Sequence, residues 1–514
     1  MKYFLTLIQL WVGFLSICAS YPKANIWIIP SVESPQVYRN YAQTSKVHLE
    51  MARGEVEHIQ LVFPSKVNEE YRFTFDRNLK GIQISARELK KMNGYYDALV
   101  PFKNQLKCTD TLTAVWITVQ CPSRVPVGKY HQTIKIEGSK HFTIQLDYNV
   151  HHTTIPLKSS IPITVGVENR CMTECLNDKE ADKERQRWVD FVLSYRMTPV
   201  FGTQITPERW QYEHSFSPWA WNDKRSIRLL NDRRYSCYML PFFTLSENEL
   251  ASLLCNIQKK GKLKESLFYI WDEPAYMEDY EQIKRKVNII RKYASDARIL
   301  TTFFCGPRNG PRKGDLYAVF DYLKHHIHVA TISLAPCKGN EEEVQHIRYK
   351  VPEGIDWWSY VCWQPGGNEP NFLLQMKGIQ QRAIMWRTWK NGSQGFLYWN
   401  CNIYHKRNPF TYITDMPHGD GILIYPGDIL GRKGPIASAR LERWRDGAEE
   451  MELLRLVEKN YSKEKADTLL NIVYSSPLSF IEKAHNIPFF RKELLDQLDK
   501  TIPIDYKLRI TDFI

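Results

Sequence analysis

The sequence predicts a multidomain protein in which an N-terminal antiparallel β-sandwich precedes a (β/α)8 TIM-type barrel and a C-terminal helical extension. Three observations predict this order. Short stretches of alternating apolar and polar residues come first, strands and helices alternate after about residue 163, and helical periodicity prevails from Ile436. The length of 514 residues accommodates two or three domains. An apolar fraction of 43% and a charged fraction of 25% exclude a wholly disordered chain.

The first 20 residues have the features of a secretory signal peptide. A basic start at Lys2 is followed by an apolar run over residues 4–17 and by small residues up to Ser20. The run is shorter than the ~20 residues that span a bilayer, and no later stretch is apolar enough for a transmembrane helix. We therefore expect residues 1–20 to be removed and the protein to be secreted or periplasmic. A retained membrane anchor and a lipoprotein anchored through Cys18 are the alternatives.

Residues 21–160 are predicted to form the sandwich. Six stretches alternate with a period of two, as strands do when they bury one face. Pro156 and Pro162 suit the exit linker, because proline interrupts a sheet. Cys108 and Cys121 flank one stretch and are candidates for a disulfide, which an exported chain permits. The six stretches are residues 47–51, 58–63, 72–75, 114–119, 132–136 and 142–148.

Residues 161–445 are predicted to form the (β/α)8 barrel. Their number fits the ~250 residues usual for that fold. An open doubly wound sheet is the alternative, but no glycine-rich phosphate or dinucleotide loop follows a strand. Residues 446–514 continue as helices and form the predicted extension. Within the barrel, apolar strands over residues 267–271, 299–304 and 395–399 alternate with helical stretches over 182–195, 246–260 and 280–293.

Two adjacent carboxylates, Asp272 and Glu273, end an apolar strand directly before Pro274. In a parallel barrel, the C-terminal ends of the strands face the active site. Neighbouring strand residues point to opposite faces, so both acids serve one site only where the strand ends, and Pro274 provides that ending. Crowding raises the pKa of one carboxyl and keeps it protonated, as the general acid of a glycosidase must be. The alternative is that the acids cap the following helix.

Four segments carry a recognisable pattern: FYIWDEP at residues 268–274, GFLYWNCN at 395–402, HGDGILIYPG at 418–427 and SARLERWRDGAEEMELL at 438–454. They resemble glycoside hydrolase family 123 and the exported barrel proteins allied to it. The resemblance implies a β-N-acetylgalactosaminidase with an N-terminal sandwich and a catalytic barrel. It places the catalytic pair on Asp272 and Glu273 and requires neither a metal nor an organic cofactor.

The resemblance also implies a retaining, substrate-assisted mechanism. The 2-acetamido oxygen of the sugar would attack its own anomeric carbon and form an oxazolinium intermediate, so no carboxylate nucleophile is needed. Glu273 would be the general acid and then the base for water. Asp272 would hold the acetamido N–H and stabilise the developing positive charge.

Aromatic and amide side chains near the strand ends are candidates for the walls of the substrate site. Aromatic faces stack on pyranose rings, and amide groups bond their hydroxyls. Core packing is the alternative for each tryptophan. The HGDG segment, which contains Asp420, is typical of a turn and leaves a role in a substrate loop open. The candidate substrate-binding residues are Trp271, Trp358, Tyr360, Trp386, Tyr398, Trp399 and Asn400.

The RWRDGAEE segment is predicted to be a helix braced by ion pairs. Glu442 with Arg445, Arg443 with Asp446, and Arg445 with Glu449 lie three or four residues apart, which brings side chains together on a helix. Each acid then has a basic neighbour and little need of a substrate. We therefore expect this segment to stabilise the barrel.

We predict an exported glycoside hydrolase that removes terminal β-linked N-acetylhexosamine, with N-acetylgalactosamine as the preferred sugar. The net charge of +12 suits an acidic glycan, and a glycolipid is a second candidate partner. Nucleic acid is not expected, because the basic residues form no stripe and no nucleic-acid-binding motif occurs. No zinc-type cysteine and histidine spacing occurs, so no metal is expected. The alternatives are a same-scaffold glycosidase acting on another sugar and a non-catalytic glycan-binding protein; no oligomeric state is predicted.

Overall fold

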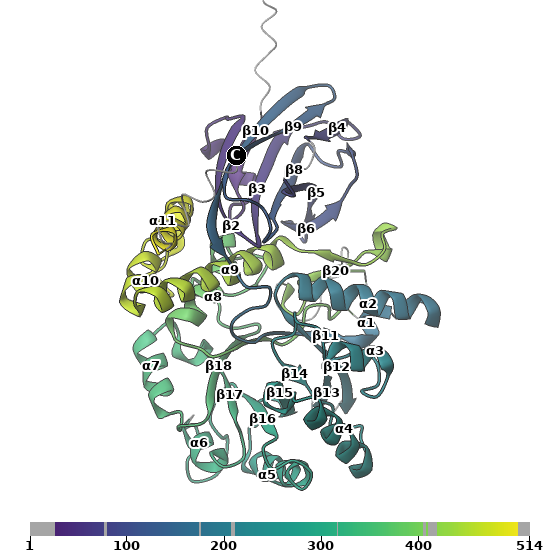
Figure 1. The fold of residues 1–514 in the computed structure, drawn as a ribbon, viewed down its shortest axis with the longest axis vertical. Helices are drawn as coiled ribbons and strands as arrows, with labels where there is room; N and C mark the ends of the chain where they lie inside the picture. The colour runs from purple at the N-terminus through teal and green to yellow at the C-terminus, as the bar shows by residue number, and fades with distance from the viewer. Residues whose placement is uncertain are drawn as a thin grey trace, which may run out of the picture.

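The computed structural model stacks a strand-rich N-terminal part on a larger part built from strands and helices (Figure 1). The predicted signal peptide, residues 1–20, lies outside the described residues. Among the helices that the structure describes, none is both long and apolar enough to cross a membrane. The structure describes residues 26–76, 80–173, 176–206, 211–315, 317–404, 408–409 and 419–501.

Two five-stranded sheets make up the N-terminal part. The first contains, in sheet order, β1 (Trp27–Pro30), β3 (Glu55–Pro64), β8 (Leu112–Cys121), β5 (Gln83–Met92) and β6 (Tyr95–Pro101). The second contains β2 (Lys46–Arg53), β10 (His141–Thr154), β9 (Gly128–Glu137), β4 (Glu70–Phe75) and β7 (Gln105–Lys107). All six predicted strands are confirmed. Both sheets contribute to one hydrophobic cluster, with Leu61 and Phe63 from the first and Ile134 and Ile144 from the second.

The N-terminal sheets differ from the prediction in two respects. β10 pairs with β2 in parallel, because a long connection separates them, whereas the other pairs are antiparallel. The predicted disulfide is wrong, since Cys108 and Cys121 are both free thiols. Cys108 lies near the start of β8, where its N–H bonds Glu69, and Cys121 ends that strand. Ten strand residues span about 30 Å, far beyond the reach of a disulfide.

The second part contains a nine-stranded sheet that closes almost into a barrel. Every neighbouring pair is parallel except one antiparallel pair at the edge. The two edges of the sheet approach each other. The N–H of Phe216, directly after the strand at one edge, donates to the carbonyl of Met239, in the strand at the other edge, at 2.6 Å. In sheet order the strands are β13 (Gln211–Ser215), β12 (Thr198–Thr206), β11 (Ile163–Glu168), β19 (Phe396–Tyr398), β18 (Asp356–Val361), β17 (Val329–Ser333), β16 (Arg298–Phe303), β15 (Ser266–Trp271) and β14 (Tyr238–Met239). The antiparallel pair is β12 with β13.

Helices follow the strands along the chain and cover the outside of this sheet (Figure 1). They are α1 (Asn169–Thr173), α2 (Asp178–Ser194), α3 (Lys224–Leu229), α4 (Glu247–Lys259), α5 (Met277–Arg291), α6 (Ala318–Leu323), α7 (Glu341–Lys350), α8 (Gly378–Lys390) and α9 (Ala439–Asn460). A small hairpin of β20 (Ile424–Pro426) and β21 (Pro435–Ala437) precedes α9. Two further helices, α10 (Lys463–Leu470) and α11 (Ile487–Asp499), end the described chain, and α11 contacts β2 and β10.

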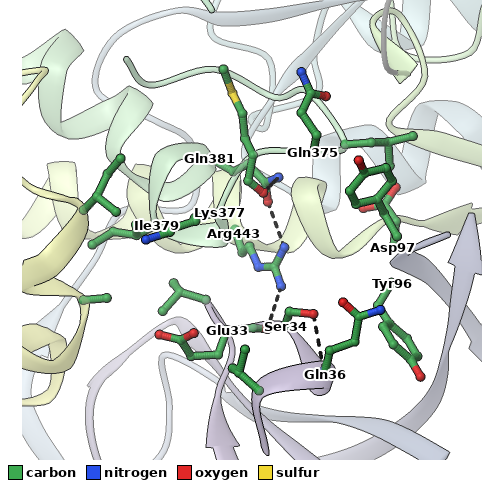
Figure 2. Close-up of a pocket in the computed structure, with 18 of the residues that line it drawn as sticks. Glu33, Ser34, Gln36, Tyr96, Asp97, Gln375, Lys377, Ile379, Gln381 and Arg443 are labelled. Atoms are coloured by element: carbon green, nitrogen blue, oxygen red, sulfur yellow. Dashed lines mark hydrogen bonds between the residues drawn. The ribbon is translucent and has the colours of Figure 1, made fainter. Parts of the chain in front are cut away.

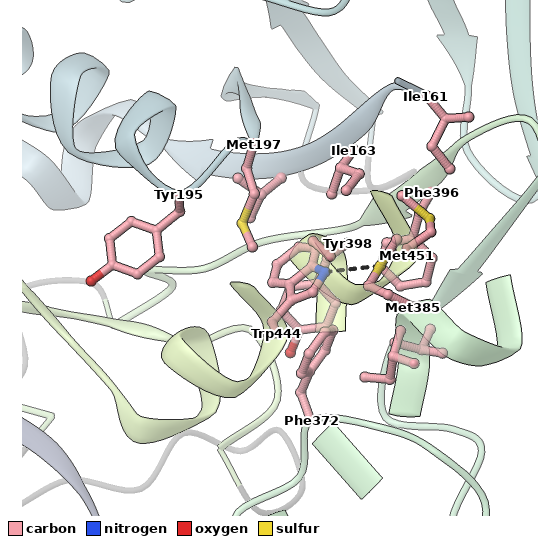
Figure 3. Packing of buried hydrophobic residues seen from close by; sticks show 14 of the residues in the cluster. Ile161, Ile163, Tyr195, Met197, Phe372, Met385, Phe396, Tyr398, Trp444 and Met451 are labelled. Carbon is pink, nitrogen blue, oxygen red and sulfur yellow. Dashed lines mark hydrogen bonds between the residues drawn. The ribbon is translucent and has the colours of Figure 1, made fainter. Parts of the chain in front are cut away.

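Helix α9 is anchored to β19 by a buried aromatic cluster (Figure 3). The Trp444 ring lies 4.7 Å from that of Phe372 and 5.7 Å from that of Phe396, measured between centroids. The Trp444 indole N–H donates to the sulfur of Met385 on α8 at 3.2 Å. This packing fixes β19, the strand that leads directly to Trp399.

Helix α9 also carries a buried ion-pair network. The predicted pair between Glu442 and Arg445 is confirmed. The predicted Arg445–Glu449 pair is wrong, because Glu449 binds Arg196 at 3.1 Å. Arg87 of β5 binds Glu442 as well, at 2.5 Å. Spacing along one helix predicts only pairs within that helix, whereas tertiary packing adds charges from the N-terminal sheets and from the barrel-like part.

The predicted Arg443–Asp446 pair is also wrong. Asp446 binds Arg382 of α8 at 3.1 Å. Arg443 instead donates to the carbonyl of Ser31 at 2.7 Å and to the side chain of Gln381 at 2.8 Å. It lies in the wall of a cavity of about 640 Å³ between the N-terminal sheets and α8 (Figure 2). Its guanidinium thus ties the turn after β1 to α8.

Candidate active site

Strand β15 contains an extra residue at its C-terminal end. It pairs with β16 so that Tyr269 lies opposite Leu300, but Trp271 lies opposite Thr301, which leaves Ile270 as the inserted residue. Such a bulge flips the facing of every side chain after it, because strand side chains alternate.

The bulge turns Asp272 into the interior of the barrel-like sheet. Tyr269 packs among the side chains that fill the inside of the barrel-like sheet. Ile270 and Trp271 both pack on its outside, in the core shared with the helices. Asp272 then accepts hydrogen bonds from the hydroxyls of Tyr269 and Thr302, each at 2.7 Å. In a regular strand of the same sequence without a bulge, Trp271 would face inward and Asp272 outward. The prediction that Pro274 alone brings the acids together is therefore incomplete.

Glu273 reaches the same site through its backbone conformation. Its φ angle is 45°, in the left-handed region that non-glycine residues seldom adopt. Its N–H donates to the Thr302 hydroxyl at 3.0 Å, which fixes this turn. Its carboxyl oxygen accepts a hydrogen bond from the Tyr360 hydroxyl, at the end of β18. Thr302 and Tyr360 thus hold the two neighbouring carboxylates in one place.

The surroundings favour different protonation states for the two acids. The pKa of Glu273 is raised to about 7, first by burial and then by the Asp272 charge, while the Tyr360 hydrogen bond and Arg308 lower it in part. Burial raises the pKa of Asp272 as well, while its Tyr269 and Thr302 donors favour the ionised form. Both side chains keep surface open to solvent. Glu273 is therefore the better acid for holding a proton near neutral pH, and Asp272 the better one for holding a negative charge.

A pocket crosses the sheet interior beside Asp272. β15 and β19 lie four places apart in the sheet, so Asp272 and Trp399 approach from opposite sides. Gly166 of β11 makes this arrangement possible, because a Cβ there would lie 1.8 Å from the carbonyl oxygen of Trp399. The lining residues are Thr164, Gly166, Val167, Val200, Gly202, Tyr212, His214, Tyr269, Asp272, Leu397, Tyr398, Trp399 and Asn400.

Asp420 fixes the orientation of the Trp399 ring. The Trp399 indole N–H lies 3.1 Å from both carboxylate oxygens, and the Tyr398 hydroxyl donates to the same carboxylate at 2.9 Å. Asp420 is fully buried, and burial raises its pKa to about 6. The HGDG segment thus supports a pocket wall through Asp420, while His418 lies outside the described residues.

The structure separates the predicted substrate-binding residues. Tyr360, Tyr398, Trp399 and Asn400 lie in or beside the pocket. Trp271 packs in the outer core, with the Lys286 ammonium 5.8 Å from its ring centroid.

Two other predicted tryptophans lie in the protein interior. Trp358 is 1% exposed and packs within the interior cluster of the sheet. The prediction for Trp386 is wrong. Its indole N–H donates to Glu450 at 2.8 Å, and its ring packs against Phe490 with centroids 5.9 Å apart, so it joins α8 to the C-terminal helices.

Three residues of the site were not predicted. Tyr269 and Thr302 hold Asp272, and the His214 ring stacks on Tyr269 with centroids 4.2 Å apart. Burial lowers the pKa of His214 to about 4, so its imidazole is neutral near pH 7. Tyr269 belongs to the apolar strand predicted over residues 267–271, but the bulge that aligns it with Asp272 leaves no sequence signal. β13, which carries His214, was not predicted at all.

The described residues contain no group of three or more histidine, cysteine, aspartate or glutamate side chains arranged to hold a metal ion. The side chains that meet at this site are the two carboxyl groups and their hydroxyl donors.

The model of the glycoside hydrolase 123 catalytic domain matches residues 183–457. The chain belongs to glycoside hydrolase family 123. This confirms the resemblance and makes the protein a glycoside hydrolase. None of the curated proteins matches the chain.

The fold of this family 123 enzyme is similar to that of a solved relative. A family 123 glycoside hydrolase from Clostridium perfringens, studied for glycolipid glycan hydrolysis, superimposes with a TM-score of 0.64 at 14% identity, covering 95% of this chain and 100% of that chain. A GH5 xyloglucanase from Bacteroides ovatus has a TM-score of 0.26 at 10% identity, covering 79% of this chain and 98% of its own. A GH2 β-galacturonidase from Eisenbergiella tayi reaches 0.34 at 8% identity, covering 77% and 90%.

Proposed function

We propose that this family 123 enzyme is exported and removes terminal β-linked N-acetylhexosamine, with N-acetylgalactosamine as the preferred sugar. The proposed reaction retains the anomeric configuration and proceeds through an oxazolinium intermediate. The sugar is the end residue of a glycan carried by a lipid or bearing acidic groups. The Clostridium perfringens relative studied for glycolipid glycan hydrolysis and the net charge of +12 support these two substrate classes.

In this mechanism the two carboxyl groups have separate roles. Glu273 gives its proton to the glycosidic oxygen, and the acetamido oxygen of the same sugar attacks the anomeric carbon as the bond to the leaving group breaks. Asp272 accepts a hydrogen bond from the acetamido N–H and stabilises the positive charge that develops on that group. Glu273 then takes a proton from water, which attacks the anomeric carbon and opens the oxazolinium ring.

The observation that carries the proposal is the division of the carboxylate pair. Asp272 is held by two hydroxyl donors inside the pocket. Glu273 is the next residue, and its pKa is raised to about 7. Asp272 is the only carboxylate among the described residues that line this pocket. Asp420 lies behind Trp399 and is fully buried. A usual retaining glycosidase needs a second carboxylate across the sugar as the nucleophile. A substrate whose acetamido group is the nucleophile does not need one.

The proposed sugar site is made by the pocket itself. Trp399 offers an aromatic face whose orientation Asp420 fixes, and Asn400 lies next to it for hydroxyl groups. Tyr360 contacts the acid, and Tyr398 supports the wall from behind through Asp420.

We propose the corresponding domain organisation for the chain. The signal peptide covers residues 1–20, the N-terminal sheets form a β-sandwich domain over 21–160, and residues 161–445 form a (β/α)8 barrel in which β13 is an insertion at the seam. Residues 446–514 form the helical extension. The order of eight strands in parallel pairs, each followed by a helix, supports this assignment of the barrel.

Two nitrophenyl substrates test the mechanism directly. We expect the wild type to hydrolyse nitrophenyl β-N-acetylgalactosaminide and to leave the analogue with a 2-hydroxyl group intact. Glu273→Gln is expected to lower kcat about 100-fold or more, because it removes the transferable proton. Glu281→Gln is the matched control, since Glu281 is exposed on α5 and pairs there with Lys284 at 2.8 Å.

The outcomes separate the three readings of the site. Hydrolysis of the 2-hydroxy analogue without hydrolysis of the N-acetyl sugar would contradict the substrate-assisted mechanism and favour a glycosidase for another sugar. Glycan binding without turnover, unchanged by Glu273→Gln, would favour a non-catalytic glycan-binding protein.

A further inference from the structure

Two aromatic rings stand at the rim of the barrel-like sheet. Trp363 is 46% exposed, and Phe304 is half-buried. Their ring centroids lie 6.4 Å apart, with an interplanar angle of 18°. An exposed indole keeps apolar surface in water at a cost in free energy, and a ring held parallel to a second ring is a rigid face for a flat apolar partner.

These rings follow directly on the residues that hold the carboxylate pair. Phe304 comes two residues after Thr302, which contacts Asp272 and the backbone of Glu273. Trp363 comes three residues after Tyr360, whose hydroxyl donates to Glu273.

The strands that carry the two rings open on one rim. β16 and β18 both pair in parallel with β17, which lies between them, so their C-terminal ends point the same way. Phe304 follows the end of β16, and Trp363 lies two residues beyond the end of β18. β15 also pairs in parallel with β16, so Glu273, which follows β15, stands on the same rim as the two rings.

The group attached to the glycosidic oxygen must leave past the acid that protonates this oxygen. In the proposed function that acid is Glu273, so the leaving glycan passes over the two rings. A pyranose presents a face of C–H groups that stacks on an indole, and stacking of this kind leaves the ring hydroxyls in water.

We propose that Trp363, supported from behind by Phe304, forms the subsite for the leaving glycan, and that the pyranose ring next to the scissile bond stacks on the Trp363 face. This inference rests on the proposed function, because Glu273 as the acid defines the leaving side. It assigns Trp363 to recognition of the leaving group, apart from the pocket that holds the terminal sugar.

Two substrates with the same terminal sugar but different leaving groups test the subsite. The first is a disaccharide of β-linked N-acetylgalactosamine and a hexose, and the second is the corresponding N-acetylgalactosaminyl fluoride, which has no leaving ring. We expect Trp363→Ala to lower kcat/KM about tenfold for the disaccharide, mainly through KM, and to change it less than twofold for the fluoride. Trp363→Phe is expected to restore most of the loss. Tyr349→Ala is the matched control, because Tyr349 is an aromatic residue on α7 that is 86% exposed.

An equal loss for both substrates, or no loss for the disaccharide, would overturn the subsite while leaving the proposed function intact. If the wild type hydrolyses neither substrate, the proposed function fails and calorimetric titration with the disaccharide decides the subsite. Binding that Trp363→Ala weakens about tenfold would then support a glycan platform. Absent binding, or binding unchanged by the substitution, would overturn it.

Discussion

Tyr360→Phe isolates the hydrogen bond that controls the protonation of Glu273. The Tyr360 hydroxyl donates to the Glu273 carboxyl, which favours the ionised form and holds the pKa below the value that burial alone would give. Removing this donor therefore raises the pKa of Glu273 above about 7. The protonated form is the active one, so the substitution extends activity to higher pH.

The size of the shift follows from the strength of the lost bond. A hydrogen bond to a charged group contributes ~1.5–3 kcal/mol, and one pKa unit corresponds to about 1.4 kcal/mol. Glu273 keeps surface open to solvent, so water replaces part of the lost bond and the lower end of this range applies. We expect the alkaline limb of the pH profile to move upward by about one pH unit.

The assay is the pH dependence of kcat/KM on nitrophenyl β-N-acetylgalactosaminide between pH 4 and 10, where the alkaline limb reports the acid of the free enzyme. For the wild type this limb is expected near pH 7. Tyr293→Phe is the matched control, because it removes a hydroxyl donor to Glu247 at 2.6 Å on the outer surface. An alkaline limb that stays in place or moves to lower pH in Tyr360→Phe would refute the assignment of Glu273 as the acid.

Three further outcomes are expected. The pKa of Glu273 is raised from 4.5 to about 7 in the folded protein, so its ionisation lowers the stability of the fold as pH rises through this range. Glu273→Gln removes this loss, and calorimetry should show Tm raised by about 1–2 °C more at pH 8 than at pH 4. Gly166→Ala would press a methyl group against the Trp399 carbonyl and should lower the free energy of unfolding by about 2–3 kcal/mol in denaturant titration, whereas Gly366→Ala, with no neighbour closer than 3.7 Å, should change it little. Glu442→Gln removes the charged carboxylate from a buried ion-pair network and should lower the free energy of unfolding by about 3–5 kcal/mol in the same titration. A decrease under 1 kcal/mol would mean that the network does not stabilise the fold.

Local periodicity was sufficient to predict those regular elements whose residues alternate or repeat cleanly. The strands found in the N-terminal part by alternation are those with a clean period of two, such as residues 58–63. β5, with the sequence QISARELKKM, escaped detection because its charged and apolar residues do not alternate cleanly. β13 escaped because it is a short, polar edge strand.

The same contrast applies to the tryptophans. Trp399 follows the apolar strand β19 and lies beside the pocket, and its contact with a sugar stays a prediction. Trp386 shares its residue type and was predicted in the same way, yet it packs between α8 and the C-terminal helices. A side chain on a helix that is buried on every side gives no signal of which neighbour covers it.

The sequence by itself determined that two carboxylates follow an apolar strand, and the family pattern around them pointed to glycoside hydrolysis. Only the tertiary structure decided how these carboxylates share one site. An extra residue in β15 turns Asp272 inward, and hydroxyls from β16 and β18 fix the pair. The physical reason is distance along the chain. Local periodicity indicates whether a residue is buried, whereas the partner of a buried polar group lies on a strand dozens of residues away and is set by packing.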